Sequence, residues 1–512
     1  MFKKTNRFSN CVRLAAFGLA VLLALPASAV ADNRYLLLLK EGGKANNKFS
    51  SQVEKAGGQI RLVVDEIGLV VVSSSDPGFK ARAAGLRGVQ EVAFSRPIRT
   101  DQGVESYQGP QNGGSHLGED EFFYPLQWGI DEVGAPAAWN AGHTGAGATV
   151  AVLDGGIDHD NADFADNLNH GLSISFMPCD FGLNCDGDVE DWRVSEIDEY
   201  PGEYPEHGQG PFFNHGTHVA GTIAAGDNGT GGIGVAPDAE IIAVKVCTEF
   251  DTYCLDEAML PGIVHAASVG ADVINMSLGG LFDRNPKDFC NFLKEVDAGV
   301  PCGKVYVSET RAVISMYRRA ISYANSMGTT LVVSAGNSAL DADHTGSLLF
   351  FLADFPNVLG ISATAPVGGS LPAVFGDAPP APLASPESLA YYSNYGRTII
   401  DFAAPGGSIE LLFYLSDPFN TWCESSGLFD LCFLMDIVLS NAPGDYFFYA
   451  QGTSMAAPHA AGVAALLVGK NGGDMNPKRL HNAMKKCALD LGQRGKDPIY
   501  GFGYASAACL GD

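Results

Sequence analysis

Positive charge is scarce in this sequence of 512 residues. Lysine and arginine together number 32, against 58 aspartates and glutamates, which gives a formal net charge of -26 at pH 7. Binding to nucleic acid or to an anionic membrane depends on basic side chains that neutralise phosphates, so this shortage argues against both partners. The acidic excess is densest at residues 180–206, a stretch that fits a solvated loop or a site for a divalent cation or a basic substrate segment.

Long hydrophobic runs are also missing after the N-terminus. The run at the N-terminus, LAAFGLAVLLAL at residues 14–25, follows four basic residues and precedes the small-residue stretch PASAVAD. It is too short for a hydrocarbon core of about 30 Å, and this order of segments is typical of a secretory signal peptide. We therefore expect residues 1–31 to be cleaved off, and the mature protein to be secreted or periplasmic without a membrane span.

No CxxC pair occurs, and no cysteine pair has a histidine at zinc-finger spacing, so the cysteines are not expected to bind metal. Cys11 lies in the expected signal peptide, and the ten that remain are an even number, as disulfides in an exported protein require. Other connectivities are open, but the simplest pairing joins sequence neighbours: Cys179–Cys185, Cys247–Cys254, Cys290–Cys302, Cys423–Cys432 and Cys487–Cys509.

Three short strings supply an aspartate, a histidine and a serine in that order: AVLDGGIDHD, NHGTHVAGTIAA and QGTSMAAPHAAG. Nucleophilic acyl transfer needs a hydroxyl that attacks, an imidazole that takes its proton and a carboxylate that holds the imidazole. Asp154, His215 and Ser454 are the candidates for these three roles.

The strings resemble those of the subtilisin-like serine proteases (subtilases, peptidase S8 family), and the resemblance runs from about residue 126 to the C-terminus. LVVSAGNSA and NMSLGG match two further strings of the family. The resemblance implies an α/β fold with a parallel sheet wrapped by helices. The functional residues that it implies are the catalytic Asp154, His215 and Ser454, the oxyanion-binding Asn337, and the substrate-binding Ser277, Leu278 and Gly279.

The serine and the asparagine each have a simpler interpretation. Ser454 stands where a helix is expected to begin, which is a common place for a capping serine, and Pro458 is expected in the first turn of that helix. Asn337 follows an apolar run and suits a turn. The surrounding strings favour the catalytic interpretation of both.

The aspartate and the histidine have competing neighbours. Two histidines three residues apart, His215 and His218, would also suit a pair of metal ligands; the resemblance makes His215 the base and gives His218 and His459 structural roles. Asp158 and Asp160 fall after the turn that follows Asp154, and we expect them to face solvent.

Catalysis of this kind needs no cofactor, but a structural calcium ion is an open question. Asp163 and Asn228 match positions where the family often binds calcium, with main-chain carbonyls of the loop GDNGTGGIG as further ligands. The same residue types are common in loops that bind no ion.

The sequence divides into four parts. After the signal peptide, residues 32–99 have the order strand, helix, strand, strand, helix, strand, which is typical of a small ferredoxin-like α+β domain. This part is either a separate binding domain or, as its place before a protease domain suggests, an inhibitory propeptide.

Residues 100–121 are polar and glycine-rich, without the periodicity of a helix or strand, and suit a linker where processing occurs. Residues 122–512 form the expected catalytic domain.

The sequence thus predicts a secreted serine endopeptidase that acts on polypeptides, is made as a self-processing zymogen and is monomeric. Two alternatives remain open. Long inserts at residues 177–212, 281–309, 367–385 and 409–448 have little counterpart in a minimal subtilisin, and they suit a maturation protease for one exported substrate. A catalytically silent binding protein on the same fold is the second alternative, although no member of the triad is missing.

Overall fold

A computed structural model provides the fold. It describes residues 33–99, 106–111, 121–178, 192–194, 213–229, 231–248, 253–283, 304–367, 373–375, 385–415, 418–425, 428–444 and 446–511. The expected signal peptide and the pairs Cys179–Cys185 and Cys290–Cys302 lie outside these residues, as does most of the acidic stretch at 180–206.

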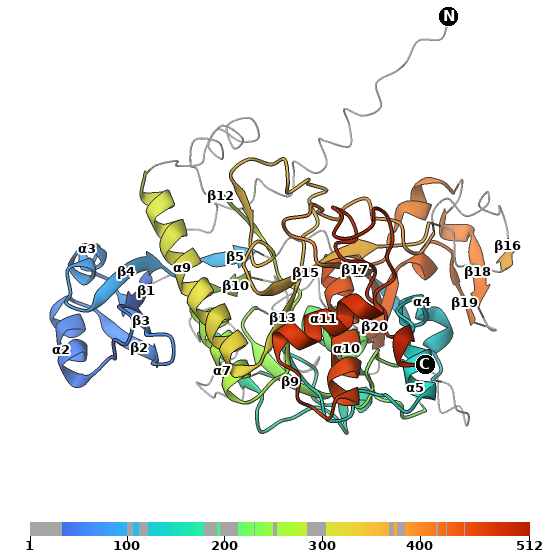
Figure 1. The fold of residues 1–512 in the computed structure, drawn as a ribbon, viewed down its shortest axis with the longest axis horizontal. Coiled ribbons are helices and arrows are strands. Elements are labelled where there is room, and N and C mark those ends of the chain that lie inside the picture. Colours follow the sequence, from blue (N-terminus) through green and yellow to red (C-terminus); the bar gives the residue numbers. More distant parts are fainter. Residues whose placement is uncertain are drawn as a thin grey trace, which may run out of the picture.

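Residues 33–94 form a separate N-terminal module at one end of the molecule (Figure 1). Its four strands form one antiparallel sheet in the order β2-β3-β1-β4, and two helices cover one face, so the predicted α+β order is confirmed. The elements are β1 (Asn33–Leu39), α2 (Asn47–Lys55), β2 (Gln59–Val64), β3 (Leu69–Ser74), α3 (Phe79–Ala84) and β4 (Val89–Phe94).

The apolar run YLLLL in β1 is buried on both faces of its sheet. Side chains alternate along a strand, so Tyr35 and Leu37 join the module's own core with Phe79, whereas Leu36 and Leu38 join a core shared with the rest of the chain. The module is therefore docked on the larger domain through an apolar sheet face.

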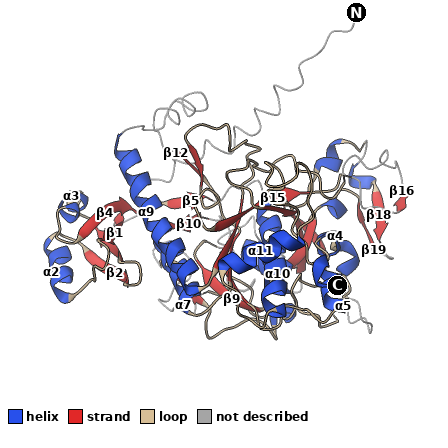
Figure 2. Cartoon of the chain, viewed as in Figure 1, coloured by secondary structure: helices blue, strands red, loops and turns tan. Residues whose placement is uncertain are grey.

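The larger domain is built on seven parallel strands in the order β17-β15-β13-β11-β7-β9-β8, and the predicted fold class is confirmed. Figure 2 shows helices on both sides of this sheet. The strands are β7 (Thr149–Asp154), β8 (Ile174–Ser175), β9 (Glu240–Lys245), β11 (Val273–Met276), β13 (Thr330–Ser334), β15 (Val358–Thr364) and β17 (Phe402–Pro405). The helices are α4 (Trp128–Glu132), α5 (Ala135–Asn140), α6 (His215–Ala224), α7 (Asp256–Ser268), α9 (Lys304–Met327), α10 (Thr453–Lys470) and α11 (Pro477–Cys487).

Each face of this sheet has its own core. Val150 and Val152 of β7 pack in the cluster that contains α6 and α10, whereas Ala151 and Leu153 pack in the cluster that contains α7 and α9. When helices cover both faces of a strand, successive side chains are buried on alternate sides of the sheet. The sequences of these strands are therefore nearly continuous apolar runs. No described helix is long and apolar enough to cross a membrane.

Short strands outside the two main sheets tie distant segments together. β5 (Pro97–Arg99) pairs with β10 (Tyr253–Leu255), and β6 (Ser106–Gln111) pairs with β21 (Tyr446–Ala450). The expectation that residues 100–121 hold no regular element is thus wrong for β6, because its partner strand lies in an insert remote in sequence. The others are β12 (Leu281–Asp283), β14 (Leu348–Phe350), β16 (Ala373–Phe375), β18 (Trp422–Ser425), β19 (Leu428–Leu431) and β20 (Val438–Ala442).

Three of the predicted disulfides are formed in the described part of the chain: Cys247–Cys254, Cys423–Cys432 and Cys487–Cys509. The first joins residues seven positions apart, one of them Cys254 of β10, and the second lies within an insert. Because a crosslink reduces the conformational freedom of a loop, these bonds hold peripheral segments against the sheet.

Candidate active site

The buried pair of Asp154 and His215 is the first part of the site. Asp154 is the last residue of β7, and His215 is the first residue of α6. The Nδ1 atom of His215 lies 2.8 Å from Oδ2 and 3.0 Å from Oδ1 of Asp154, whose carboxylate also accepts a hydrogen bond from the Gly155 main-chain N–H at 2.7 Å. The carboxylate is 1% exposed, so the imidazole and this N–H offset the cost of its burial.

Local sequence explains why the two elements meet. Asn214 caps α6 by accepting a hydrogen bond from the Thr217 main-chain N–H at 2.8 Å, which fixes where the helix begins. A Cβ atom at Gly216 would lie 2.1 Å from the carbonyl oxygen of Gly156, so only glycine lets the helix approach the turn after β7. The small residues in the strings around Asp154 and His215 are therefore required by close packing.

Ser454 is the second residue of α10, and it is linked to Ser277 by two hydrogen bonds. The Ser454 hydroxyl donates to the Ser277 carbonyl at 3.1 Å, and the Ser277 hydroxyl donates to the Ser454 carbonyl at 2.7 Å. Pro458 explains the second bond: it is the sixth residue of α10, not part of the first turn as the sequence suggested, and it has no N–H to donate to the Ser454 carbonyl. Ser277 supplies the missing donor.

Asn337 follows β13 and is held against the start of α10. Its Oδ1 atom accepts hydrogen bonds from the main-chain N–H of Thr453 at 2.8 Å and from the Thr453 hydroxyl at 2.7 Å. The Thr453 hydroxyl also accepts a bond from the Gly336 N–H at 3.0 Å. Thr453 thus fixes the orientation of the Asn337 amide, a contribution that sequence reasoning missed because its partner is more than a hundred residues away.

Ser277, Leu278 and Gly279 continue from the end of β11 and are all buried. At Gly280, the residue that follows this segment, the side chain of Ile98 lies 3.3 Å from the position a Cβ atom would take. Ile98 is also the residue of β5 that pairs with Cys254 of β10. An extended segment of the chain itself therefore lies along β10, within reach of the predicted substrate-binding segment.

Two other histidines near the site are fully buried. The ring of His218 bonds the carbonyls of Val438 and Phe448 at 3.2 and 3.0 Å, and burial lowers its pKa to about 3. His459 bonds the Met455 carbonyl at 2.8 Å, and burial lowers its pKa to about 4. Both rings are neutral near pH 7 and are occupied by main-chain groups, as expected of structural residues.

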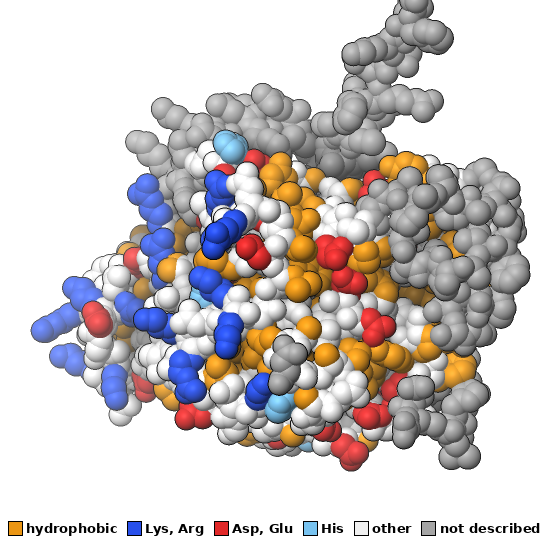
Figure 3. Space-filling model, turned by 45° about the vertical axis from the view of Figure 1, so that its right-hand side comes forward, with side chains coloured by type: hydrophobic (Ala, Val, Ile, Leu, Met, Phe, Trp, Pro, Cys, Tyr) orange, Lys and Arg blue, Asp and Glu red, His pale blue; other side chains and the backbone are white. Residues whose placement is uncertain are grey.

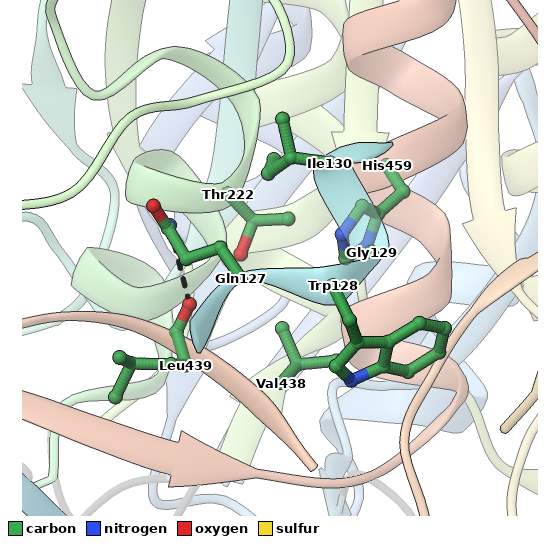
Figure 4. A pocket seen from close by; sticks show the side chains of 8 residues that line it. All are labelled: Gln127, Trp128, Gly129, Ile130, Thr222, Val438, Leu439 and His459. Carbon is green, nitrogen blue, oxygen red and sulfur yellow. Dashed lines mark hydrogen bonds between the residues drawn. The ribbon is translucent and has the colours of Figure 1, made fainter. Parts of the chain in front are cut away.

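Figure 4 shows a small cavity beside His459 that contains none of the candidate catalytic residues. The Gln127 side chain spans it and donates to the carbonyls of Ile233 and Leu439 at 3.1 and 3.4 Å. The lining residues are Gln127, Trp128, Gly129, Ile130, Thr222, Val438, Leu439 and His459. The polar side chains that line the cavity are mostly hydrogen-bonded to main-chain atoms, so we assign the cavity a packing role.

The structure corrects the expectation for Asp158. Asp160 is exposed, as predicted, but Asp158 is buried and accepts a hydrogen bond from the Gly444 N–H at 2.7 Å. Its own N–H donates to the Thr217 hydroxyl at 3.0 Å. The residue connects the turn after β7 to the loop between β20 and β21, which belongs to an insert that the sequence could not place.

The predicted calcium residues lie close together and have an unexpected neighbour. The Asn228 side-chain amide donates to Asp163 at 3.1 Å, and Glu121 accepts bonds from the main-chain N–H groups of Asn228 and Gly229, each at 2.6 Å. Burial raises the pKa of Glu121 to about 7, with further contributions from Asp163 and Asp227. Its Oε2 atom is buried without a hydrogen-bond partner in the described structure. No group of three or more His, Cys, Asp or Glu side chains suited to a metal occurs among the described residues.

Known proteins resemble this chain in sequence and in fold. Subtilisin BL from Lederbergia lenta is 29% identical over 382 residues, which cover 75% of this chain and 97% of that protein. Subtilisin E from Bacillus subtilis (strain 168) is 28% identical over 353 residues, 69% of this chain and 63% of that protein. The crystal structure of the epidermin leader peptide processing serine protease from Staphylococcus aureus superimposes with a TM-score of 0.67 at 20% identity, over 94% of this chain and 98% of that one.

The model of the subtilase family matches residues 145–503, which include the buried Asp154–His215 pair, Asn337 and Ser454. The sheet order and the position of each string at the end of a strand or the start of a helix fit this match. The chain belongs to the subtilase family and is a serine endopeptidase.

Proposed function

We propose that this chain is an exported endopeptidase, made as an inactive precursor, in which Ser454, His215 and Asp154 form the catalytic triad. The observation that carries the proposal is the buried hydrogen bond, 2.8 Å long, between Nδ1 of His215 and Oδ2 of Asp154. A carboxylate placed there holds the Nδ1–H of the imidazole, which leaves Nε2 to accept a proton. The helix start that carries Ser454 is tied to the same sheet through Ser277.

The reaction follows from these positions. The Ser454 hydroxyl turns from the Ser277 carbonyl to His215 and attacks the substrate carbonyl as His215 takes its proton. The tetrahedral oxyanion is stabilised by the N–H of Ser454, at the positive end of the α10 dipole, and by the side-chain amide of Asn337. His215 then protonates the leaving amine. Water attacks the acyl-enzyme by the same route, with His215 as base, and releases Ser454.

Active-site labelling tests the assignment of the nucleophile. A fluorophosphonate probe reacts with an activated serine, so the matured protein is expected to be labelled at Ser454 and at no other hydroxyl, with peptide mapping by mass spectrometry as the readout. Thr453 is the internal control, since its hydroxyl is adjacent in sequence but bonded to Asn337. Labelling that is absent, or that falls on another residue, would contradict the proposal.

The N-terminal module is proposed as the inhibitory propeptide. It carries eleven lysines and arginines but only six aspartates and glutamates between residues 33 and 99, whereas the whole chain has a net charge of -26. Figure 3 shows Lys and Arg side chains concentrated toward the side where this module lies. The opposite charges favour association, and strand β5, which follows the module, occupies the edge of β10 where a substrate would pair.

A maturation protease for one exported substrate is the second candidate. The Staphylococcus aureus structure that shares this fold, N-terminal module included, is of a protease that processes the epidermin leader peptide. The inserts of the present chain would then restrict access to the cleft. Rapid digestion of denatured casein would favour a degradative enzyme, whereas self-processing without casein digestion would favour the second candidate.

We also propose a structural calcium ion at the predicted residues Asp163 and Asn228, with main-chain carbonyls of their loop and, in addition to the predicted set, Glu121 as further ligands. The unpartnered Oε2 of Glu121 supports this site, because a buried carboxylate oxygen suits a hard cation. In a Ser454→Ala background, which prevents autolysis, EDTA is expected to lower the melting temperature by about 5 °C, and calcium to restore it. Calorimetry measures the change.

Two variants make the calcium test specific. Glu121→Gln is expected to melt at the same temperature with and without EDTA, because it lacks the charge that would hold the ion. Asp166→Asn, an exposed neighbour that makes no part of the site, is expected to retain the response. No effect of EDTA on the unsubstituted protein would rule out the ion.

A further inference from the structure

Arg96, the residue directly before β5, contacts the first residue of α7. The main-chain N–H of Asp256 donates to the Arg96 carbonyl at 3.3 Å, and the Arg96 N–H donates to Oδ2 of Asp256, also at 3.3 Å. The Nε atom of the Arg96 guanidinium lies 3.6 Å from the same carboxylate oxygen. These contacts extend the pairing of β5 with β10 by one residue and add a charge interaction.

The Asp256 carboxylate is fixed in place and enclosed. Its side chain is 0% exposed, and its second oxygen accepts a hydrogen bond from the Tyr317 hydroxyl at 2.9 Å. The aromatic ring of Phe282 also contacts the guanidinium, with its centroid 4.8 Å from Cζ of Arg96. A site that combines a buried carboxylate and an aromatic ring is favourable for a cation, because both attract positive charge and water is excluded.

Few directed bonds hold the guanidinium itself. The Nε and Nη2 atoms of Arg96 are buried and make no hydrogen bond in the described structure, and the ion pair is longer than a charged hydrogen bond. The site therefore selects a positive charge on a long side chain rather than the planar shape of arginine. When Arg96 departs, Asp256 loses its only ion pair in the described structure. A buried carboxylate without a partner charge is unfavourable, so another cation is favoured there.

We infer that Asp256 and Phe282 form a specificity site that binds a lysine or arginine of the polypeptide substrate. This substrate residue takes the place of Arg96, two positions before the substrate residue that pairs with Cys254. The inference rests on the proposed function, since it requires that a substrate lie along β10 as β5 does. The interaction is expected to improve substrate binding, because the contacts of Asp256 and Phe282 in the described structure include none with Asp154, His215 or Ser454. It should therefore change KM and leave kcat nearly constant.

The test uses the matured enzyme and quenched fluorescent peptides with the chain's own sequence at residues 94–105, FSRPIRTDQGVE. Four peptides carry Arg, Lys, Ala or Glu at the position of Arg96, and mass spectrometry confirms that rates are compared at one bond. We expect the Arg and Lys peptides to have a kcat/KM about tenfold above the Ala peptide, through KM, and the Glu peptide to be cleaved more slowly still. Equal kcat/KM for all four would overturn the inference.

An enzyme variant locates the effect. In Asp256→Asn, which keeps the acceptor for Tyr317 but removes the charge, the ratio of the Arg to the Ala peptide is expected to fall to about one. Glu309→Gln is the matched control, because Glu309 contacts Lys80 of the N-terminal module, which the peptides lack, and its ratio is expected to stay about ten. A ratio that survives in Asp256→Asn would overturn the inference. Failure of the proposed function is distinguishable, because then none of the peptides is cleaved and Ser454 takes no label.

Discussion

Replacing Ser454 by alanine is expected to lower kcat for a peptide substrate by about a millionfold, the scale set by loss of the nucleophile in subtilisin itself. The Ser454 hydroxyl is the group that forms the acyl-enzyme in the proposed mechanism. Alanine fits the same space and adopts the helix readily, so the fold should be preserved. A fluorogenic peptide assay on protein of confirmed thermal stability measures the effect.

The control for this variant is an exposed serine outside the site. Ser326, near the end of α9, donates only to the Tyr323 carbonyl in its own helix, and Ser326→Ala is expected to retain full activity. A Ser454→Ala protein that cleaves the peptide at a tenth of the original rate or faster would show that another residue attacks the substrate.

Replacing Asp154 by asparagine is expected to lower kcat by about ten-thousandfold while KM changes little. The carboxylate accepts the Nδ1–H of His215 at 2.8 Å and so leaves Nε2 free of a proton. An amide nitrogen at that position would donate to Nδ1 and favour the opposite tautomer, which cannot take the proton of Ser454. Steady-state kinetics on a peptide substrate separate the two constants.

Asp160→Asn is the matched control, since Asp160 lies on the same turn, is exposed and contacts only His159 at 3.2 Å among the ion pairs described. Its kcat is expected to equal that of the unsubstituted enzyme. If Asp154→Asn lost less than tenfold in kcat, the carboxylate would not be holding the catalytic imidazole, and the hydrogen bond between the two side chains would be structural.

The sequence predicted those features that depend on short segments. Apolar runs in the sequence coincide with six of the seven strands of the large sheet, because a strand covered on two faces is largely apolar. The seventh strand, β8, has two residues and is too short to form such a run. The ends of those runs placed Asp154 and Asn337 at one edge of the large sheet. The disulfide Cys247–Cys254 was also predictable, because its partners are close in sequence.

Features that depend on contacts between distant segments were not predictable. The hydrogen bonds between Ser277 and Ser454 join residues 177 positions apart, and they determine how α10 tolerates Pro458. Asp158 was expected to face solvent because nothing in the sequence shows that the loop after β20 folds over it. The contact of Arg96 with Asp256 spans 160 positions, so neither residue could be recognised in advance.

The most direct measurement of the central claim is the intact mass and N-terminal sequence of the secreted protein beside its Ser454→Ala variant. The account predicts that the unsubstituted protein loses everything up to a point between Arg96 and Trp128, whereas the variant retains residues 32–99. Retention of this segment by both proteins, or its removal from both, would contradict self-processing by Ser454.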